Sequence, residues 1–287
     1  MEAPSIKTEG RRIIRVMFSR RVAILGFIIA VFFMLTAIFG PLIAPYDPIE
    51  QNINNILEAP SREHFLGTDD LGRDILSRII YGARVSLMVG VVAVTISAVV
   101  GMSLGLIAGY FNKWVNNIIM RIIDAFMALP SMVLILAIAS ILGGGLFNVM
   151  IVLGIGLIPT YCRLMCAQVL SIKENDYIIS AKALGSSDLR IILRHVLPNA
   201  FPPLLVLITL QIGTAILMEA SLSFLGIGIS PPTATWGSMV SVGYNYLLSN
   251  PLLSFAPGIA ILLVVLAFNL IGDGLRDALD PRLRGTL

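Results

Sequence analysis

The sequence predicts an all-α membrane protein with six transmembrane helices, and its composition is the first reason. Hydrophobic residues make up 57% of the 287 residues and charged residues only 13%, and the mean hydropathy is +0.90. These values lie far outside the range of soluble globular domains. Six apolar runs separated by polar segments are the second reason. The third is an uneven distribution of basic residues, which gives the chain a direction in a membrane.

The first 84 residues predict one span and one large outer loop. Residues 1–21 are polar and basic, and we expect them to form a cytoplasmic segment. The first transmembrane helix is expected within residues 22–44, because Val22–Phe39 is an uncharged apolar run. No small-residue cleavage site follows this run, so we expect no removable signal peptide. Residues 45–84 are polar and are expected to form an extracytoplasmic loop.

A core of five further spans is predicted within residues 85–273. Several of these runs are rich in glycine and serine, which permit close packing of membrane helices. A charged loop at residues 171–199 divides them, and residues 274–287 are expected to form a cytoplasmic tail. The expected spans are Val85–Tyr110, Ile118–Leu142, Phe147 to about Leu170, Ala200–Leu225 and Leu252–Ile271.

Basic residues predict which side of the membrane each loop occupies. Six spans place both ends of the chain on one side, together with the loops at 110–121 and 163–199. That side holds 16 of the 20 lysines and arginines, and the other side holds four. Because cytoplasmic loops carry the excess of Lys and Arg, both termini and the 171–199 loop are predicted to be cytoplasmic.

The cytoplasmic loop contains a stretch, Asp176–Asn199, that predicts helix, turn and helix. Apolar residues and alanines form the first helix, which is interrupted at Gly185. Ser186, Ser187 and Asp188 can cap a second helix that runs to Leu197. Small residues beside a glycine turn offer a surface that another protein can approach closely. The alternative interpretation, an ordinary solvated loop, is equally compatible with these residues.

In the outer loop, the segment from His64 to Leu87 predicts an interfacial helix that leads into the second span. Thr68 or Asp69 can cap this helix. Asp70 and Asp74 fall near its positive end.

Two acidic residues fall inside expected spans, where ionisable groups are costly and often functional. Glu219 lies near the outer end of the fifth span, where it could meet a substrate amino group or, as the favoured alternative, act as a structural hydrogen-bonding residue. Asp124 follows Arg121 by three residues, a spacing that predicts an ion pair within one helix.

Residue types exclude several chemistries. The two histidines, His64 and His195, fall in loops on opposite sides, which argues against an intramembrane hydrolase. No lysine follows a glycine, so the phosphate-binding loop of an ATPase is missing. Cys162 and Cys166 have no nearby histidine and are expected to be small core residues, so no metal site is predicted. A secondary transporter remains an alternative, although one central buried acid and no internal repeat fit it poorly.

Four ordered motifs carry a resemblance to one family. They are HFLGTDDLGRDILSRIIYGAR from His64, Gly185 followed at the right distance by Leu197-Pro198, EASLSFLG from Glu219 with Pro231-Pro232 and Trp236-Gly237, and NLIGDGLRDALDP from Asn269. Together they resemble the second permease subunits of ATP-binding-cassette (ABC) importers for dipeptides, oligopeptides, nickel or glutathione. The second motif departs from that family's coupling loop, because Ile179-Ser180-Ala181 replaces Glu-Ala-Ala and His195 replaces a hydrophobic residue.

The resemblance implies a type I ABC importer permease fold in a bacterial or archaeal inner membrane. The chain would form half of an alternating-access pathway, with a homologous permease, two ATPase chains, an extracytoplasmic binding protein and membrane lipid as partners. It would bind no cofactor itself, since ATP and Mg²⁺ belong to the ATPase chains, and no nucleic acid. The residues expected to contact an ATPase are Ser180, Ala181, Lys182, Ala183, Leu184, Gly185, Asp188 and Pro198. Candidates for the receptor-facing loops are Asp69, Arg73, Asp74 and Trp236, and Glu219 is the candidate for the pathway.

Overall fold

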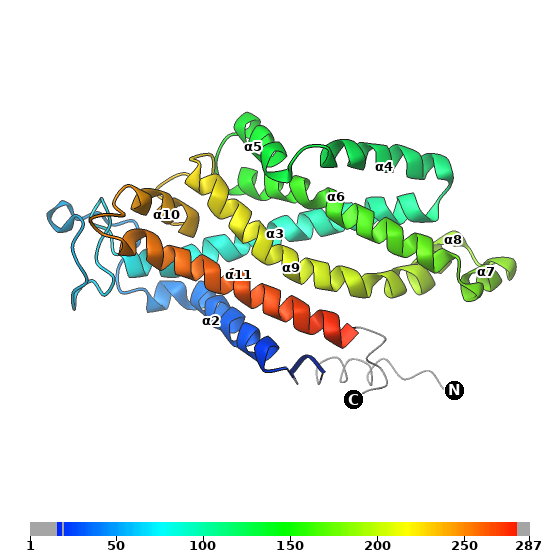
Figure 1. Cartoon of the computed structure of the whole chain (residues 1–287), viewed down its shortest axis with the longest axis horizontal. Coiled ribbons are helices and arrows are strands. Elements are labelled where there is room, and N and C mark those ends of the chain that lie inside the picture. Colours follow the sequence, from blue (N-terminus) through cyan, green and yellow to red (C-terminus); the bar gives the residue numbers. More distant parts are fainter. Residues whose placement is uncertain (1–15, 19, 280–287) are drawn as a thin grey trace.

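The computed structural model describes residues 16–18 and 20–279, and no β-strand occurs among them (Figure 1). Most of the segment at 1–21 and the end of the tail at 274–287 therefore lie outside the described residues. Within this described part of the chain, five helices are long and apolar enough to cross a membrane. They are α2 (Arg21–Ile43), α3 (Ile75–Tyr110), α6 (Leu146–Lys173), α9 (Leu197–Phe224) and α11 (Leu252–Leu279). The all-α membrane fold predicted from the sequence is confirmed.

The sixth span is a broken one. Residues predicted as a single helix at Ile118–Leu142 form α4 (Lys113–Met127) and α5 (Ser131–Leu142), which bend by 88° at the break. Pro130 explains the break, because proline removes a backbone donor and disfavours a helical conformation in the residue before it. Counting this bent pair as one span gives the predicted six.

The fifth span begins earlier than predicted. Instead of ending at Leu197, the helix that starts at Asp188 continues through α8 (Asp188–Ile191) and a π-helical segment (Ile192–Val196) into α9. The wider π-helical turn lies directly before Pro198, where the ring would otherwise crowd the preceding carbonyls. The chain is therefore continuously helical from Asp188 into the membrane core.

The most extensive helix contact is between α3 and α6. Gly101, Gly105 and Gly109 form a stripe on α3 that faces α6. A Cβ atom at Gly101 would lie only 2.7 Å from the Cβ atom of Tyr161. Cys162 and Cys166 are buried on α6, beside this glycine stripe. The contact follows the small-residue packing rule for membrane helices.

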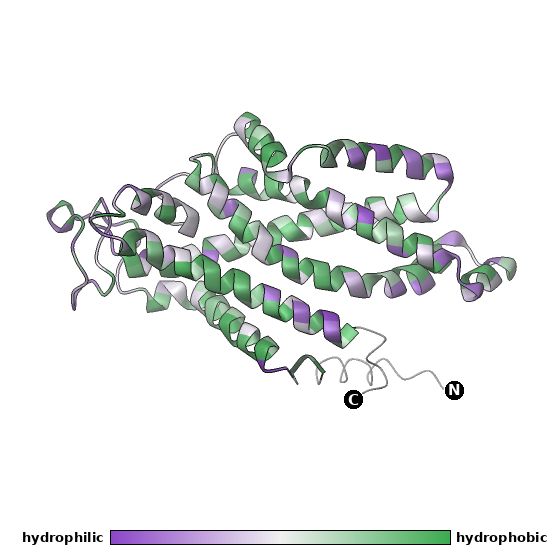
Figure 2. Cartoon of the chain, in the orientation of Figure 1, coloured by the Kyte–Doolittle hydropathy of each residue, from purple (hydrophilic) through white to green (hydrophobic). Residues whose placement is uncertain are grey.

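Figure 1 shows that the molecule has two polar ends, with α2, α4 and α9 running away from the α7 end and α3, α6 and α11 running toward it. One end carries α7 (Asp176–Ala183) and α8, and the other carries α10 (Trp236–Tyr244) and the loop that precedes α3. The start of α2 and the end of α11 both point toward the α7 end, where Arg20 pairs with Asp277 at 2.7 Å. Hydrophobic residues cover the helices between the ends (Figure 2).

The sidedness of these two ends is tested by thiol labelling. We expect a single cysteine at Asn54 or Asn245, both exposed at the α10 end, to react with an impermeant thiol reagent added to intact cells. A cysteine at Ser187, exposed beside α8, should react only after the cells are broken, because the excess of basic residues predicts that the α7 end is cytoplasmic. Each variant is made in a background without Cys162 and Cys166. Reaction at Ser187 alone would invert the orientation.

Candidate functional site

The short helix α7 ends in a turn at Gly185, which redirects the chain into α8. The N–H of Gly185 donates to the carbonyl of Lys182, and the N–H of Ser186 donates to the carbonyl of Ala181. This pair of bonds is the Schellman arrangement, which needs a left-handed residue, and Gly185 has φ of +81°. The helix–turn–helix predicted for Asp176–Asn199 is confirmed in its position and in its glycine turn.

The inner side of α7 packs on the membrane core. Ile178 is buried in one apolar cluster with Ile191 and Val196, and Ala181 packs against the same cluster. Ala181, one of the residues predicted to contact an ATPase, is half-buried against this chain. Its small size therefore serves the seating of α7 on the bundle.

The outer side of α7 and its turn is exposed. Leu184 is 87% exposed and Ile179 is 57% exposed, although both are large apolar residues. The other predicted contact residues that lie on this exposed end are Ser180, Lys182, Ala183, Gly185 and Asp188. Pro198 is exposed elsewhere, beside an apolar groove between α3 and α9.

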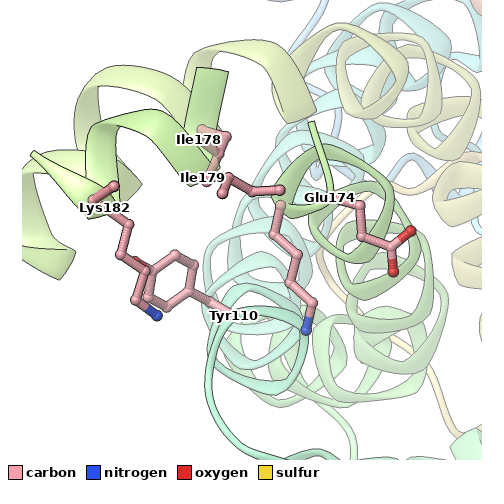
Figure 3. Close-up of a pocket in the computed structure, with 7 residues that line it drawn as sticks. Tyr110, Glu174, Ile178, Ile179 and Lys182 are labelled. Carbon is pink, nitrogen blue, oxygen red and sulfur yellow. The ribbon is translucent and has the colours of Figure 1, made fainter. Parts of the chain in front are cut away.

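A cavity of about 690 Å³ lies between α7 and the ends of α3 and α6 (Figure 3). Its lining is mixed in polarity and consists of Tyr110, Lys173, Glu174, Ile178, Ile179, Lys182 and Ala183. Two polar contacts hold its walls together. The hydroxyl of Tyr110 donates to Asp188 Oδ1 at 2.7 Å, and Lys173 Nζ donates to the carbonyl of Gly109 at 2.9 Å. Both contacts tie the loop to the end of α3.

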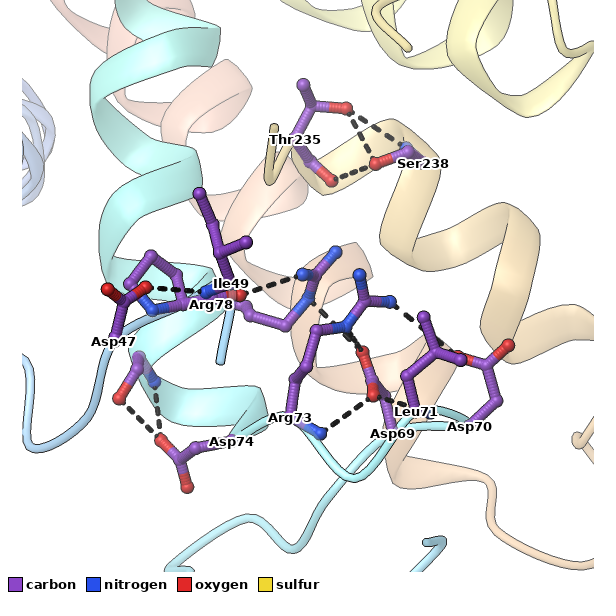
Figure 4. Close-up of polar contacts among 12 residues, drawn as sticks. Asp47, Ile49, Asp69, Asp70, Leu71, Arg73, Asp74, Arg78, Thr235 and Ser238 are labelled. Carbon is purple, nitrogen blue, oxygen red and sulfur yellow. Dashed lines mark hydrogen bonds and ion pairs between the residues drawn. The ribbon is translucent and has the colours of Figure 1, made fainter. Parts of the chain in front are cut away.

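At the opposite end, a buried charge network holds the loop that precedes α3 (Figure 4). Asp69 Oδ2 accepts from Arg73 Nε at 2.8 Å and lies 3.3 Å from Arg78 Nε. All three side chains are less than a tenth exposed. Arg78 also donates to the carbonyl of Pro48 at 2.9 Å. One carboxylate thus serves two arginines, and the network closes the loop onto the helix.

The helix cap in this loop differs from the prediction. Asp74, instead of Thr68 or Asp69, caps α3, and its Oδ2 accepts from the N–H and the hydroxyl of Ser77 at 2.7 Å each. Its Oδ1 lies 3.0 Å from His64 Nδ1. No separate interfacial helix forms, because α3 runs unbroken from Ile75 to Tyr110. The Asp69 carboxylate binds the two arginines and is therefore not free to cap α3, which explains why Asp74 caps the helix instead.

Trp236 and Glu219 are also enclosed, and neither side chain is exposed at all. Trp236 Nε1 donates to the carbonyl of Ile79 at 3.0 Å, and its ring lies against Gly82. Glu219 Oε1 accepts from Ser223 at 2.8 Å, and its Oε2 lies 3.5 Å from Ser86 Oγ. Glu219 therefore acts as a hydrogen-bonding residue between α3 and α9 in this conformation. The receptor-facing candidates Asp69, Arg73, Asp74 and Trp236 are buried and support their loops from within.

One ion pair was assigned to the wrong partner. Asp124 on α4 does not pair with Arg121 of the same helix but with Arg163 of α6, at 2.6 Å. Sequence spacing favours neighbours within a helix, whereas this pair spans 39 positions. The one feature of the sequence that could have indicated this pair is Arg163 itself, a basic residue inside an expected apolar span.

The geometry defines a multi-pass membrane protein with a short helix projecting from one end. Residues 101–285 match the family of binding-protein-dependent transport system inner membrane components. Residues 8–60 match the N-terminal transmembrane domain of oligopeptide transport permease C. The chain therefore belongs to this family of permeases from binding-protein-dependent transport systems.

Curated relatives match over nearly the whole chain. It is 48% identical to the dipeptide transport system permease protein DppC of Alkalihalophilus pseudofirmus, over 92% of this chain and 87% of that protein. The corresponding protein of Haemophilus influenzae is 44% identical over 92% of each chain. The glutathione transport system permease protein GsiD of Escherichia coli O157:H7 is 42% identical over 93% of this chain and 88% of that protein.

Solved structures support the fold. An inward-facing form of the MetNI methionine ABC transporter superposes with a TM-score of 0.59 at 18% identity. The superposition covers 72% of this chain and 98% of that one. The type I ABC importer permease fold is thus confirmed, and the conformation compared is one that opens inward.

The buried network around Asp69 makes a testable contribution to stability. Replacing Asp69 with alanine leaves Arg73 and Arg78 without their shared partner, and breaking a buried ion pair costs about 3–5 kcal/mol. We expect the variant to unfold at a clearly lower temperature. Asp70→Asn is the control, because Asp70 is more exposed and lies 3.7 Å from Arg73. Thermal unfolding of the purified complex checks this. Equal unfolding temperatures for both variants would contradict the role given to Asp69.

Proposed function

We propose that this chain is the membrane-spanning subunit of an ABC importer that carries short peptides. The observation that carries the proposal is the match to a dipeptide permease over 92% of this chain. The family and the fold supply the general role, which is half of an alternating-access pathway. An importer of this kind receives its substrate from an extracytoplasmic binding protein.

The energy for transport comes from partner chains. Two ATPase chains bind ATP and Mg²⁺, and this chain contributes no phosphate-binding loop, since none of its lysines follows a glycine. We propose that the exposed end of α7 contacts one of these ATPases. Support comes from Leu184 and Ile179, whose exposed apolar surface at a polar end of the molecule is costly unless another protein covers it.

The same geometry explains how a movement at α7 would reach the pathway. Ile178 anchors α7 in the core, and Tyr110 bonds Asp188 at the base of α8. From Asp188 the helix continues to Phe224, through the full depth of the bundle. A displacement of α7 would therefore be passed to α8 and α9 through the packing of Ile178 against Ile191 and Val196.

The outer end is proposed to receive the binding protein, in a bacterial or archaeal inner membrane. Exposed apolar residues lie on its loops, with Ile53 80% and Phe65 63% exposed. The second permease subunit would supply the other half of the pathway. Glutathione is a second substrate candidate, because relatives named for glutathione transport are 40–42% identical. Glutathione is itself a short peptide.

Reconstitution tests the proposed function. The complete complex is placed in liposomes with its binding protein, and uptake of labelled dipeptide and glutathione is measured. We expect uptake that needs ATP and the loaded binding protein, with one of the two substrates preferred. Uptake driven by an ion gradient without ATP would instead identify a secondary transporter.

The proposed ATPase contact is tested by one substitution at its most exposed residue. Leu184→Asp places a charge in the proposed contact without touching the core, so the chain should reach the membrane normally. We expect the ATPase chains to be lost from the purified complex, because burying an unpaired carboxylate is costly. Leu248→Asp is the control, since Leu248 is fully exposed at the opposite end. Retention of the ATPases by the Leu184 variant would reject this contact.

A further inference from the structure

The exposed ion pair between Asp124 and Arg163 lies at a depth where a membrane protein rarely exposes charge. The Asp124 side chain is 54% exposed and the Arg163 side chain 49% exposed. Asp124 lies on α4 and Arg163 on α6, and both helices lie in the region between the two polar ends of the molecule (Figure 1). An ionised side chain within the hydrocarbon layer is expensive unless it faces water or protein.

Two helices give the same depth for the pair. Lys113 is the first residue of α4, and Asp124 lies eleven residues after it. At about 1.5 Å per residue that is about 16 Å from the α7 end of the bundle. Arg163 lies ten residues before Lys173, the last residue of α6. That separation is about 15 Å.

These positions lie inside the apolar layer. The 28-residue helix α6 is about 42 Å long, and the hydrocarbon layer is about 30 Å thick. A centred α6 would project about 6 Å on each side, which leaves Arg163 about 9 Å inside the layer. Arg163 does not extend back toward the nearby surface but meets a carboxylate at the same depth. A long basic side chain that faced lipid would instead extend toward the nearby membrane surface, where its charged end meets water.

The pair ends a polar stripe on α4. Lys113, Asn117, Arg121 and Asp124 recur at spacings of three and four, which places them on one side of the helix. All four are exposed. Figure 2 shows hydrophilic residues recurring along α4, in contrast to the almost wholly hydrophobic α2. The stripe therefore extends from the α7 end to the depth of the ion pair.

The break between α4 and α5 lies one turn beyond Asp124. Residues Ala128, Leu129 and Pro130 at the break are exposed. A helix end leaves backbone carbonyls without helical partners. Irregular backbone at membrane depth is tolerated where it is buried in protein or lines a water-filled cavity. The break and the ion pair are separate observations on the same elements, and both call for a polar surrounding.

We propose that the polar stripe of α4, together with Arg163, lines the water-filled passage, and that Asp124 and Arg163 contact the charged groups of a passing peptide. This inference rests on the proposed function. Asp124 would attract an ammonium group and Arg163 would attract a carboxylate, so the pair suits zwitterionic short peptides. When no peptide is present, the two side chains neutralise each other.

The first test measures water access in the assembled complex. Ala125→Cys, beside Asp124, is compared with Phe32→Cys on α2, both in a background without Cys162 and Cys166. Phe32 is a matched control, because it is 60% exposed and lies eleven residues after Arg21, at a similar depth. We expect a charged thiol reagent to modify position 125 and to leave position 32 unmodified. Failure to modify position 125 would place this face against lipid or the second permease and overturn the proposal.

The second test measures charge selectivity. ATP-driven uptake of lysyl-alanine and aspartyl-alanine is compared at saturating loaded binding protein, which is a separate chain and keeps its own affinity. We expect Asp124→Asn to lower the cation-to-anion uptake ratio and Arg163→Gln to raise it, each by about tenfold, or about 1.4 kcal/mol. Asp277→Asn, which breaks the Arg20 pair, should leave the ratio unchanged.

The outcomes separate this inference from the proposed function. Equal loss of both peptides in the two variants would mean that the ion pair is only structural. If a single variant fails to assemble, Arg121→Gln on the same polar stripe is measured instead, because it removes an exposed positive charge from the proposed passage. It should raise the cation-to-anion ratio, and an unchanged ratio would overturn the proposal. A wild-type complex that carries neither peptide would reject the proposed substrate, and the thiol test would still decide whether the face is aqueous.

Discussion

The need to satisfy every backbone polar group within the hydrocarbon layer determines most of this structure. Between the two polar ends, the described chain is helical, and glycines let the helices pack closely where α3 meets α6. Departures from regular helix are concentrated at the α4–α5 break and at the π-helical segment before Pro198. The first lies beside the proposed pathway, and the second joins α8, which follows the proposed ATPase contact, to α9.

Polar side chains at the two ends perform different tasks. At the α10 end, Asp69 and its two arginines are buried and fix a long loop onto the start of α3. At the α7 end, Tyr110 and Lys173 tie the loop that carries α7 to the last turn of α3, while Leu184 remains exposed. The helix α3 therefore begins in a stabilised loop at one end of the molecule and ends beneath the proposed ATPase contact at the other, which links the two ends through one rigid element.

The sequence was sufficient to predict features that depend on local chemistry. Apolar runs located the spans, and Gly185 with its flanking residues located the helix–turn–helix of the cytoplasmic loop. Features that depend on tertiary contacts could not be predicted from the sequence. The motif residues Asp69 and Trp236 are buried, although they occur in segments predicted as loops, because α3 and its neighbours close around them. Asp124 pairs across helices, and Ala181 faces inward, since helical spacing alone does not tell which side of a helix meets the core.

The central claim is that ATPase movement enters this chain at the exposed tip of α7. A photo-crosslinking amino acid at Leu184, compared with one at Leu248 in the same intact complex, tests it most directly. The account predicts that position 184 captures an ATPase chain, with a yield that changes on ATP binding, and that position 248 captures none. Capture of the ATPase at position 248, or of lipid alone at position 184, would contradict it.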